Sequence, residues 1–251
     1  MIVLNYHRIS ESDPRRDFYT VTPADFSAHL EVLAGRGSRV TAPDDVLDGG
    51  ADGDSVMLHF DDGTSDHYST VAPLLVRHGF RGVFFVSTAK IGNDGYMNPV
   101  QIRELAAAGH TVECHGHSHR RMDRMSREEL EDELACSVGE IHRLTGRRPR
   151  ILAPPGGFLS RKVVEAAAGC GMHILRTMRW GDNPLPLRGT LDCLVVHHGV
   201  TAGTIAGWLD GKGLWGLRMR YLAKQLVRSA MPLEFYLALR RRFIRGKHPA
   251  N

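Results

Sequence analysis

An apolar run meets two adjacent carboxylates and a glycine in the stretch Val56-Met57-Leu58-His59-Phe60-Asp61-Asp62-Gly63. Such a run is typical of a buried strand. The carboxylates indicate that the strand opens into a loop, because neighbouring charges are costly to bury unless a cation or hydrogen-bond donors meet them. Further along, His115 and His119 follow a second apolar run. Carboxylate and imidazole ligands together suit zinc or a similar first-row metal, and three protein ligands leave positions open for water and substrate. We therefore expect a metal-dependent hydrolase.

Short apolar runs alternate with amphipathic stretches along the chain, which predicts βα units around a parallel sheet. Two helices have recognisable starts. Thr22-Pro23 precedes a helix that runs to Leu33, and Ser126 to Glu129 form a capping box. The length of the chain allows one α/β barrel domain. The expected strands are residues 1–6, 55–60, 82–87, 110–115, 149–153, 172–177 and 191–197.

Polar residues follow most of these strands at the point where each strand ends. In a closed α/β barrel the carboxyl ends of the strands share one rim, where such enzymes keep their active sites. Five separate clusters at one rim therefore predict a single site. The clusters are His7, Asp61 with Asp62, His115 with His119, Pro154 to Gly157, and His197 with His198.

The composition is that of an ordinary soluble globular protein, with 42% hydrophobic and 24% charged residues and a formal net charge of +4. The N-terminal residues lack the features of an export signal, and no stretch approaches the ~18 apolar residues that span a bilayer. These features predict a cytoplasmic protein. The cysteines lack metal-finger or Cys-x-x-Cys spacing, so we expect free, buried thiols in a reducing compartment. They are Cys114, Cys136, Cys170 and Cys193.

At the polar clusters that follow the expected strands, the sequence resembles the polysaccharide deacetylase family. These are carbohydrate esterases with a distorted (β/α) barrel that remove acetyl groups from sugars. The resemblance covers about residues 1–200. The first family motif, Thr/Ser-Phe-Asp-Asp-Gly, stands here as residues 59–63 and departs only at His59. The second, His-x-x-x-His, stands as His115-Gly116-His117-Ser118-His119. The resemblance implies removal of an acetyl group from an N-acetylated sugar, glycan or glycolipid.

The resemblance also implies roles for these residues. Asp62, His115 and His119 would hold a divalent metal, zinc in most members of the family. Asp61 would be the general base that takes a proton from the attacking water. His117 is expected to turn away from the metal, and Glu113 would support the site only indirectly.

The chain departs more strongly from the third family motif, Arg-Pro-Pro-Tyr, because it has Ala153-Pro154-Pro155-Gly156 at that place. The family arginine steadies the base, so with Ala153 in its place we expect Arg176, at the end of another strand, to supply the charge. The family's oxyanion donor is a backbone N–H after the prolines, which here would be Gly156 because proline has no N–H. Pro155 is expected to line the sugar site.

The last family motif is a strand that ends Leu-x-His, whose histidine protonates the leaving amine. Here the strand runs into His197 and His198. His197 is the expected acid because it is the first polar residue after the apolar run, and His198 is the alternative. Trp180 loosely matches a region that orients this histidine. His7 either contacts substrate or makes a structural hydrogen bond. His29 and His67 are expected on helix surfaces, and Asp66 as a helix cap.

Residues 213–251 differ in composition from the barrel expected over residues 1–212. Apolar stripes are interleaved with arginine and lysine, and Pro232 is expected to divide the segment into two helices. Such a basic amphipathic tail either lies on an anionic membrane, at the inner face if the protein is cytoplasmic, or packs on the barrel or a second subunit. We expect no nucleic-acid partner, and the oligomeric state stays open. The alternative activity on the same scaffold is hydrolysis of a small amide, formamide or cyclic imide.

Overall fold

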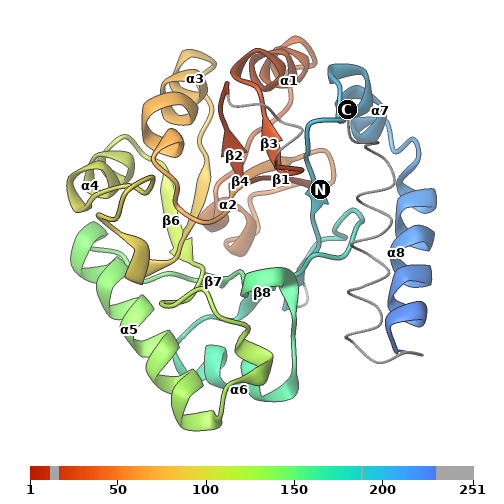
Figure 1. The fold of residues 1–251 in the computed structure, drawn as a ribbon. Helices are drawn as coiled ribbons and strands as arrows, with labels where there is room; N and C mark the ends of the chain where they lie inside the picture. Colours follow the sequence, from red (N-terminus) through yellow and green to blue (C-terminus); the bar gives the residue numbers. More distant parts are fainter. Residues whose placement is uncertain (12–16, 188, 230–251) are drawn as a thin grey trace, which may run out of the picture.

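The structure is a computed structural model that describes residues 1–11, 17–187 and 189–229, with side chains as far as residue 223. Eight parallel strands form one curled sheet, and helices surround it (Figure 1). The strand order is β10-β1-β4-β5-β6-β7-β8-β9. These strands are β1 Ile2–Tyr6, β4 Val56–Phe60, β5 Val83–Val86, β6 Thr111–Cys114, β7 Ile151–Leu152, β8 Ile174–Arg176, β9 Thr190–Leu191 and β10 Leu194–Val195. The predicted distorted (β/α) barrel is confirmed.

The distortion lies at the last strand, which the sequence predicts as one run over residues 191–197. In the structure this segment is divided between β9 and β10, at opposite ends of the strand order. Arg176 of β8 pairs with Leu191, whereas Leu4 of β1 pairs with Leu194. One short segment therefore bonds to both edges of the sheet and closes the barrel with a seam.

The α-helices are α1 Pro23–Gly35, α2 Pro43–Leu47, α3 Ala72–Arg77, α4 Pro99–Ala107, α5 Arg127–Thr145, α6 Arg161–Gly169, α7 Ala202–Leu209 and α8 Leu214–Ser229. A π-helical turn, η1 His67–Val71, leads into α3. The 3₁₀ turns are η2 Thr88–Lys90, η3 Met122–Arg124 and η4 Pro155–Gly157. A separate pair of short strands, β2 Arg8–Ile9 and β3 Thr20–Val21, lies outside the main sheet.

The helix starts follow the sequence signals. The Thr22 side chain accepts from the Asp25 amide at the start of α1, and Ser126 with Glu129 forms the predicted capping box of α5. Gly146 ends α5 with a φ of 73°, a left-handed conformation that glycine adopts without steric cost.

Alternate residues of each strand face opposite sides of the sheet and form two apolar clusters. The outer cluster, with Leu4, Leu58 and Phe84, packs against the helices. The inner cluster fills the barrel with Val3, Met57, Phe85, Ala153 and Cys193, and Val46 of α2 joins it. Continuing the alternation along β4 from Met57 places His59 and then Asp61 on the inner side. The pleat of the strands therefore carries the polar residues to one mouth of the barrel.

Several smaller sequence predictions are wrong. His29 and His67 are buried rather than on helix surfaces. Asp66 accepts a hydrogen bond from the Ile9 amide and does not cap the helix that follows it. All four cysteines are free, as expected, but Cys136 is exposed and Cys170 is only partly buried.

The predicted tail begins with α8, and residues 230–251, including Pro232, lie outside the described residues. Leu214 and Leu217 pack against the outer cluster. None of the helices that the structure describes has the length and hydropathy needed to cross a bilayer.

Candidate active site

Asp62, His115 and His119 come together at the mouth of the barrel. The Asp62 Oδ1 lies 3.3 Å from the His115 Nε2 and 2.9 Å from the His119 Nε2. One potential ligand atom from each residue lies within 4.8 Å of the other two, and no second group of this kind occurs among the described residues. One carboxylate and two imidazoles at this spacing fit a divalent cation of the zinc type.

The backbone at two of these three residues is strained. Asp62 has a φ of 81° and His119 a φ of 61°, and they are the two non-glycine residues with positive φ in the described part of the chain. Such conformations cost roughly 1–3 kcal/mol each and persist where the surrounding structure holds them. Their coincidence with two of the three candidate ligands indicates that this geometry serves the site rather than the fold.

His115 is fixed in the tautomer that a metal ligand needs. Its Nδ1 lies 2.5 Å from the Ala153 carbonyl oxygen, to which it donates as an N–H. The Nε2 is therefore left with its lone pair, and it is the nitrogen that faces Asp62. A backbone carbonyl behind a ligating histidine is a common way of orienting it. His117 turns away, as predicted, and its Nδ1 lies 2.9 Å from the Thr88 hydroxyl.

Asp61 is surrounded by donors on the inner side of the barrel. Arg176 donates to its Oδ2, and so does the Asn5 Nδ2 at 3.1 Å. The His7 Nε2 lies 3.7 Å from the same oxygen. The other oxygen, Oδ1, is buried and has no hydrogen-bond partner among the described residues. Asp61 thus keeps one oxygen fixed and one available for a proton.

These contacts also set the charge of Asp61. Burial by itself would raise the pKa of this carboxyl, but the Arg176 guanidinium, with smaller contributions from His115 and His7, lowers the pKa to about 2. Asp61 is therefore ionised at neutral pH, as a general base must be.

Arg176 lies beside Asp61, as expected for a residue that replaces the positive charge of the family arginine. Ala153, directly after β7, carries no charge and packs in the inner cluster. The guanidinium of Arg176, on β8, pairs with Asp61 instead. Arg176 is 1% exposed, and its Cζ lies 5.4 Å from the centroid of the Phe85 ring. Asp61 therefore has a cationic partner, which comes from β8.

His59 occupies the first position of the five-residue motif over residues 59–63 and is buried two residues before Asp61. Its ring packs 4.9 Å from that of Phe85, and neither ring nitrogen has a hydrogen-bond partner among the described residues. Burial and then the positive charge of Arg176 lower the pKa of His59 to about 3. His59 is therefore neutral and adds no second cation beside Asp61.

Sequence reasoning missed two aromatic residues at the mouth of the barrel. Tyr19 stacks on His7 with ring centroids 4.5 Å apart, and Phe18 stacks on His197 at 4.3 Å. The Phe18 carbonyl also lies 3.2 Å from the Nδ1 of His198. Phe18 is 48% exposed, so its ring meets both His197 and solvent. Two adjacent aromatic residues in the sequence could have indicated a binding surface. Only the fold shows which histidines they cover.

The segment that carries His197 is held from α1. The His29 Nε2 lies 3.0 Å from the Val200 carbonyl oxygen, and its Nδ1 lies 3.3 Å from the Tyr6 hydroxyl. The Gly199 amide donates to the His197 Nδ1 at 3.1 Å, so the proton of the neutral ring is on Nε2. Burial and then His198 lower the pKa of His197. The buried His29 thereby holds the loop that carries His197, the expected acid.

The structure also places the other residues that the sequence analysis named, which are Pro155, Gly156, Trp180 and Glu113. Pro155 is buried and Gly156 is exposed, with a φ of 71°, three residues after Ala153, whose carbonyl orients His115. Trp180 lines a cavity together with His197. Glu113 is not part of the candidate metal cluster, and its Oε2 accepts from the amides of Arg150 and Ile151.

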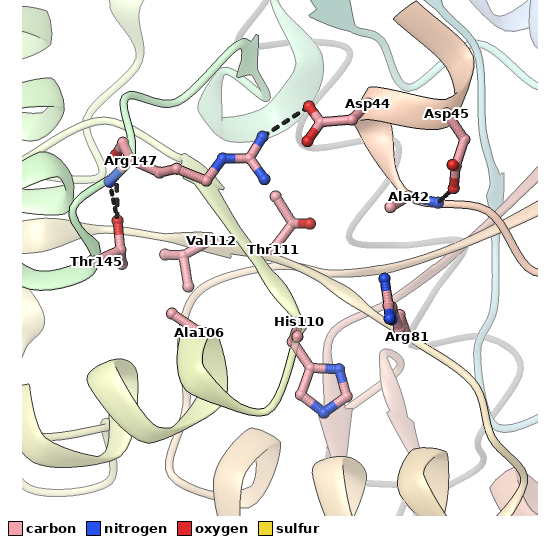
Figure 2. A pocket seen from close by; sticks show the side chains of 11 residues that line it. Ala42, Asp44, Asp45, Arg81, Ala106, His110, Thr111, Val112, Thr145 and Arg147 are labelled. Carbon is pink, nitrogen blue, oxygen red and sulfur yellow. Dashed lines mark hydrogen bonds and ion pairs between the residues drawn. The ribbon is translucent and has the colours of Figure 1, made fainter. Parts of the chain in front are cut away.

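A second cavity, of about 280 Å³, lies at the opposite end of the barrel, beside the start of β6. Figure 2 shows Arg147 directed at Asp44, and Asp45 folded back onto the Ala42 amide. Arg147 and Asp44 pair with one another there, and this end of a barrel ordinarily serves stability. The candidate active site is therefore the mouth with Asp62, His115 and His119.

Comparisons with known proteins identify relatives of this chain. The sequence model of the polysaccharide deacetylase family matches residues 48–175, just over half of the 251-residue chain. YxkH of Bacillus subtilis (strain 168) is 25% identical over 177 residues, 68% of this chain and 62% of YxkH. PdaA of the same strain, a peptidoglycan-N-acetylmuramic acid deacetylase, is 27% identical over 119 residues, 47% of this chain and 44% of PdaA. The chain thus spans less than two thirds of the length of either relative.

The fold has solved counterparts. The structure of the Streptococcus pyogenes deacetylase PplD in complex with acetate superposes with a TM-score of 0.75 at 18% sequence identity, over 82% of this chain and 96% of that one. This likeness shows a shared fold. Because the family model also covers Asp61, Asp62, His115 and His119, the chain belongs to the polysaccharide deacetylase family.

Proposed function

We propose that this protein is a metal-dependent deacetylase that hydrolyses the acetamide of an N-acetylated sugar. The observation that carries the proposal is the juxtaposition of the cluster of Asp62, His115 and His119 with Asp61, a buried and ionised carboxylate that keeps one oxygen without a partner. Family membership and the acetyl-sugar activity named for PdaA support it.

A divalent cation of the zinc type would be held by Asp62, His115 and His119, and when bound it would polarise the acetamide carbonyl and lower the pKa of water. The donor set fits such an ion because the His115 tautomer presents a bare Nε2. The protein's own groups supply the proton transfers and fix the geometry.

Asp61 takes the proton from the attacking water through its unpartnered Oδ1, while Arg176 and Asn5 hold its Oδ2 in place. A fixed base lowers the entropic cost of reaching the reactive geometry. The Gly156 amide is the proposed donor to the developing oxyanion, at the turn that follows β7.

His197 is the proposed acid that protonates the departing nitrogen. In the neutral ring its Nδ1 accepts from the Gly199 amide, so forming the imidazolium breaks that hydrogen bond, and the acid then donates its Nε2 proton to the departing nitrogen. Because burial lowers the pKa of His197, its imidazolium form gives up a proton readily. His7, beside Asp61 and covered by Tyr19, is placed to contact the sugar.

The proposal is tested by measuring acetate and formate release from the zinc-loaded full-length protein. The substrates are an N-acetylated chitooligosaccharide, a peptidoglycan fragment, a formamide and a cyclic imide. We expect acetate from the sugars and no turnover of the other two. Formate release, or hydrolysis of the imide alone, would instead favour the small-molecule activity.

We further propose that α8 brings the protein to an anionic membrane. Trp215, Met219 and Leu222 are 77%, 45% and 47% exposed and recur at helical spacing, whereas Leu214 and Leu217 pack inward. Arg218 lies among them, and basic residues near an anionic bilayer each contribute about 1 kcal/mol of attraction. An apolar stripe with neighbouring cations is typical of a helix that lies in the interface.

This membrane proposal is tested by sedimentation with vesicles that contain anionic lipid, at low and high salt. Replacing Trp215 and Met219 by alanine should reduce the bound fraction, while Val100→Ala, an exposed residue of α4, serves as the control. Equal binding of all three proteins, or none by the wild type, would contradict the proposal.

A further inference from the structure

A cavity of about 240 Å³ lies at the seam of the barrel, outside the cluster of metal ligands. Its lining comes from the end of β10 and the loop after it, from α7, from α8 and from the β8–β9 connection. Two tryptophans, Trp180 and Trp208, contribute to it, as do Thr204, Leu217 and Arg220. We call this space the seam cavity.

The seam cavity adjoins the proposed active site at His197, which lines it. His197 is half-buried, with Phe18 stacked on its ring and its Nδ1 bonded to Gly199. A substrate whose leaving nitrogen reaches His197 therefore presents its neighbouring groups to this space.

The chemistry of the lining is uneven. Apolar and aromatic side chains make up most of it, no carboxylate takes part, and Arg220 is the cationic member. Arg220 is exposed and forms no ion pair with any residue that the structure describes. Acidic residues partner several other arginines of the fold, such as Arg36 and Arg179. An arginine without a carboxylate, at the edge of an apolar space, is suited to an anionic ligand.

The size of the seam cavity limits the ligand. Pockets for drug-sized molecules begin at ~300 Å³, so this one holds little more than a single sugar ring or an anionic substituent. Tryptophan faces suit the apolar faces of sugar rings, and the hydroxyl of Thr204 adds a polar contact point.

We propose that the seam cavity binds the part of the substrate next to the N-acetyl group, and that this part carries a carboxylate or phosphate that pairs with Arg220. The inference rests on the proposed deacetylase function and narrows its substrate class to anionic N-acetylated glycans. A carboxylate would come from an acidic sugar such as the muramic acid named for PdaA, and a phosphate from a phosphate-linked sugar.

The test compares three substrates with the zinc-loaded protein: a neutral N-acetylated chitooligosaccharide, a muramic-acid-containing glycan and an N-acetylated sugar phosphate. Arg220→Met should raise KM roughly 10- to 100-fold for at least one anionic substrate, as expected for a lost charged hydrogen bond. It should lower kcat/KM for the neutral substrate far less than for that anionic substrate. Arg220→Lys should restore part of the affinity. Whichever anionic substrate responds identifies the source of the charge.

Arg77→Met removes an arginine of the same charge from α3, distant in the fold, and should affect no substrate. Equal losses on neutral and anionic substrates in Arg220→Met would overturn the inference, as would no loss on either. If the wild type hydrolyses no acetamide at all, the proposed function fails. The cavity is then tested separately by calorimetric binding of N-acetylglucosamine 1-phosphate, which Arg220→Met should weaken by a similar factor and Arg77→Met should not. Equal binding by both variants would overturn the inference that Arg220 binds an anionic group in the seam cavity.

Discussion

Arg176 donates a hydrogen bond to the Oδ2 of Asp61, and the two side chains are 1% and 2% exposed. Leaving either partner alone in such surroundings would cost several kcal/mol, because an unpaired buried charge is poorly solvated. The pair therefore has a fixed geometry and a fixed charge. It joins β8 to the end of β4 across the barrel, directly beside the proposed metal centre.

The first prediction concerns the charge of this pair. Burial favours the protonated form of Asp61 and Arg176 opposes it, so removing the guanidinium by Arg176→Met should raise the pKa of Asp61. The base is active only when ionised, and the acidic limb of the pH–kcat/KM profile should therefore move to higher pH. Arg176→Lys should move it less. An unchanged limb in Arg176→Met would show that the charge balance of Asp61 lies elsewhere.

The second prediction separates ligands from neighbours in the same motif. His115→Ala should abolish stoichiometric metal in the purified protein, because His115 Nε2 faces Asp62. His117→Ala should retain the metal, since His117 contacts Thr88 instead. Metal content measured by atomic spectroscopy checks both variants. Retention of metal at full affinity in His115→Ala would refute the ligand assignment.

The third prediction concerns Phe18, which covers the ring of His197. An aromatic stack is worth about 0.5–1.5 kcal/mol, so Phe18→Ala should lower kcat roughly 2- to 10-fold by loosening the acid. Phe18→Tyr should keep most of the rate, and Val76→Ala on α3 is the matched exposed control.

A positioning role for Phe18 has a second readout besides rate. Burial lowers the pKa of His197, so exposing the ring in Phe18→Ala should raise the pKa toward the ordinary value, which an NMR titration of that histidine can measure. An unchanged pKa and an unchanged kcat together would exclude this role.

The fourth prediction is an acid-dependent loss of stability at a site remote from the metal. The Gly82 amide donates to the His110 Nδ1, and burial, followed by the charge of Arg81, lowers the pKa of His110 from 6.5 to about 4. A folded-state pKa below the unfolded value means that the unfolded state binds the proton first. The contribution of His110 is complete above pH 6.5 and is lost as the pH falls toward 4.

Between pH 7.5 and pH 5 this loss should amount to about 2 kcal/mol. Urea unfolding at the two pH values measures it. His110→Asn keeps an acceptor without a titrating group and should lose less stability than the wild type over this interval, whereas His173→Asn, an exposed histidine, should behave like the wild type. The same pH dependence in His110→Asn and the wild type would contradict the prediction.

The barrel could be predicted from the sequence because its signals are local. Each strand is a short apolar run, and the pleat decides which polar residue reaches the mouth. Arg176 could be foreseen because the chain has Ala153 where the family has arginine, and the end of a neighbouring strand offered one cation.

What escaped prediction depends on contacts between distant segments. His29 and His67 sit in polar-looking helical stretches, yet each is buried because another element supplies a partner, the Val200 carbonyl for His29 and the His7 carbonyl for His67. The seam between β9 and β10 escaped because one apolar run can pair with two strands. The stacking of Phe18 and Tyr19 likewise requires the loop to be placed over the barrel.

The central claim is that Asp61 is a base and Asp62 a ligand, although they are adjacent in sequence. The most direct measurement is acetate release from an N-acetylated chitooligosaccharide by the wild type and by Asp61→Asn, each with its metal content determined. An amide cannot take the proton but can occupy the same space, so we predict full metal occupancy and a rate lowered about 10²- to 10⁴-fold. Loss of the metal from Asp61→Asn, or a rate close to that of the wild type, would contradict the account.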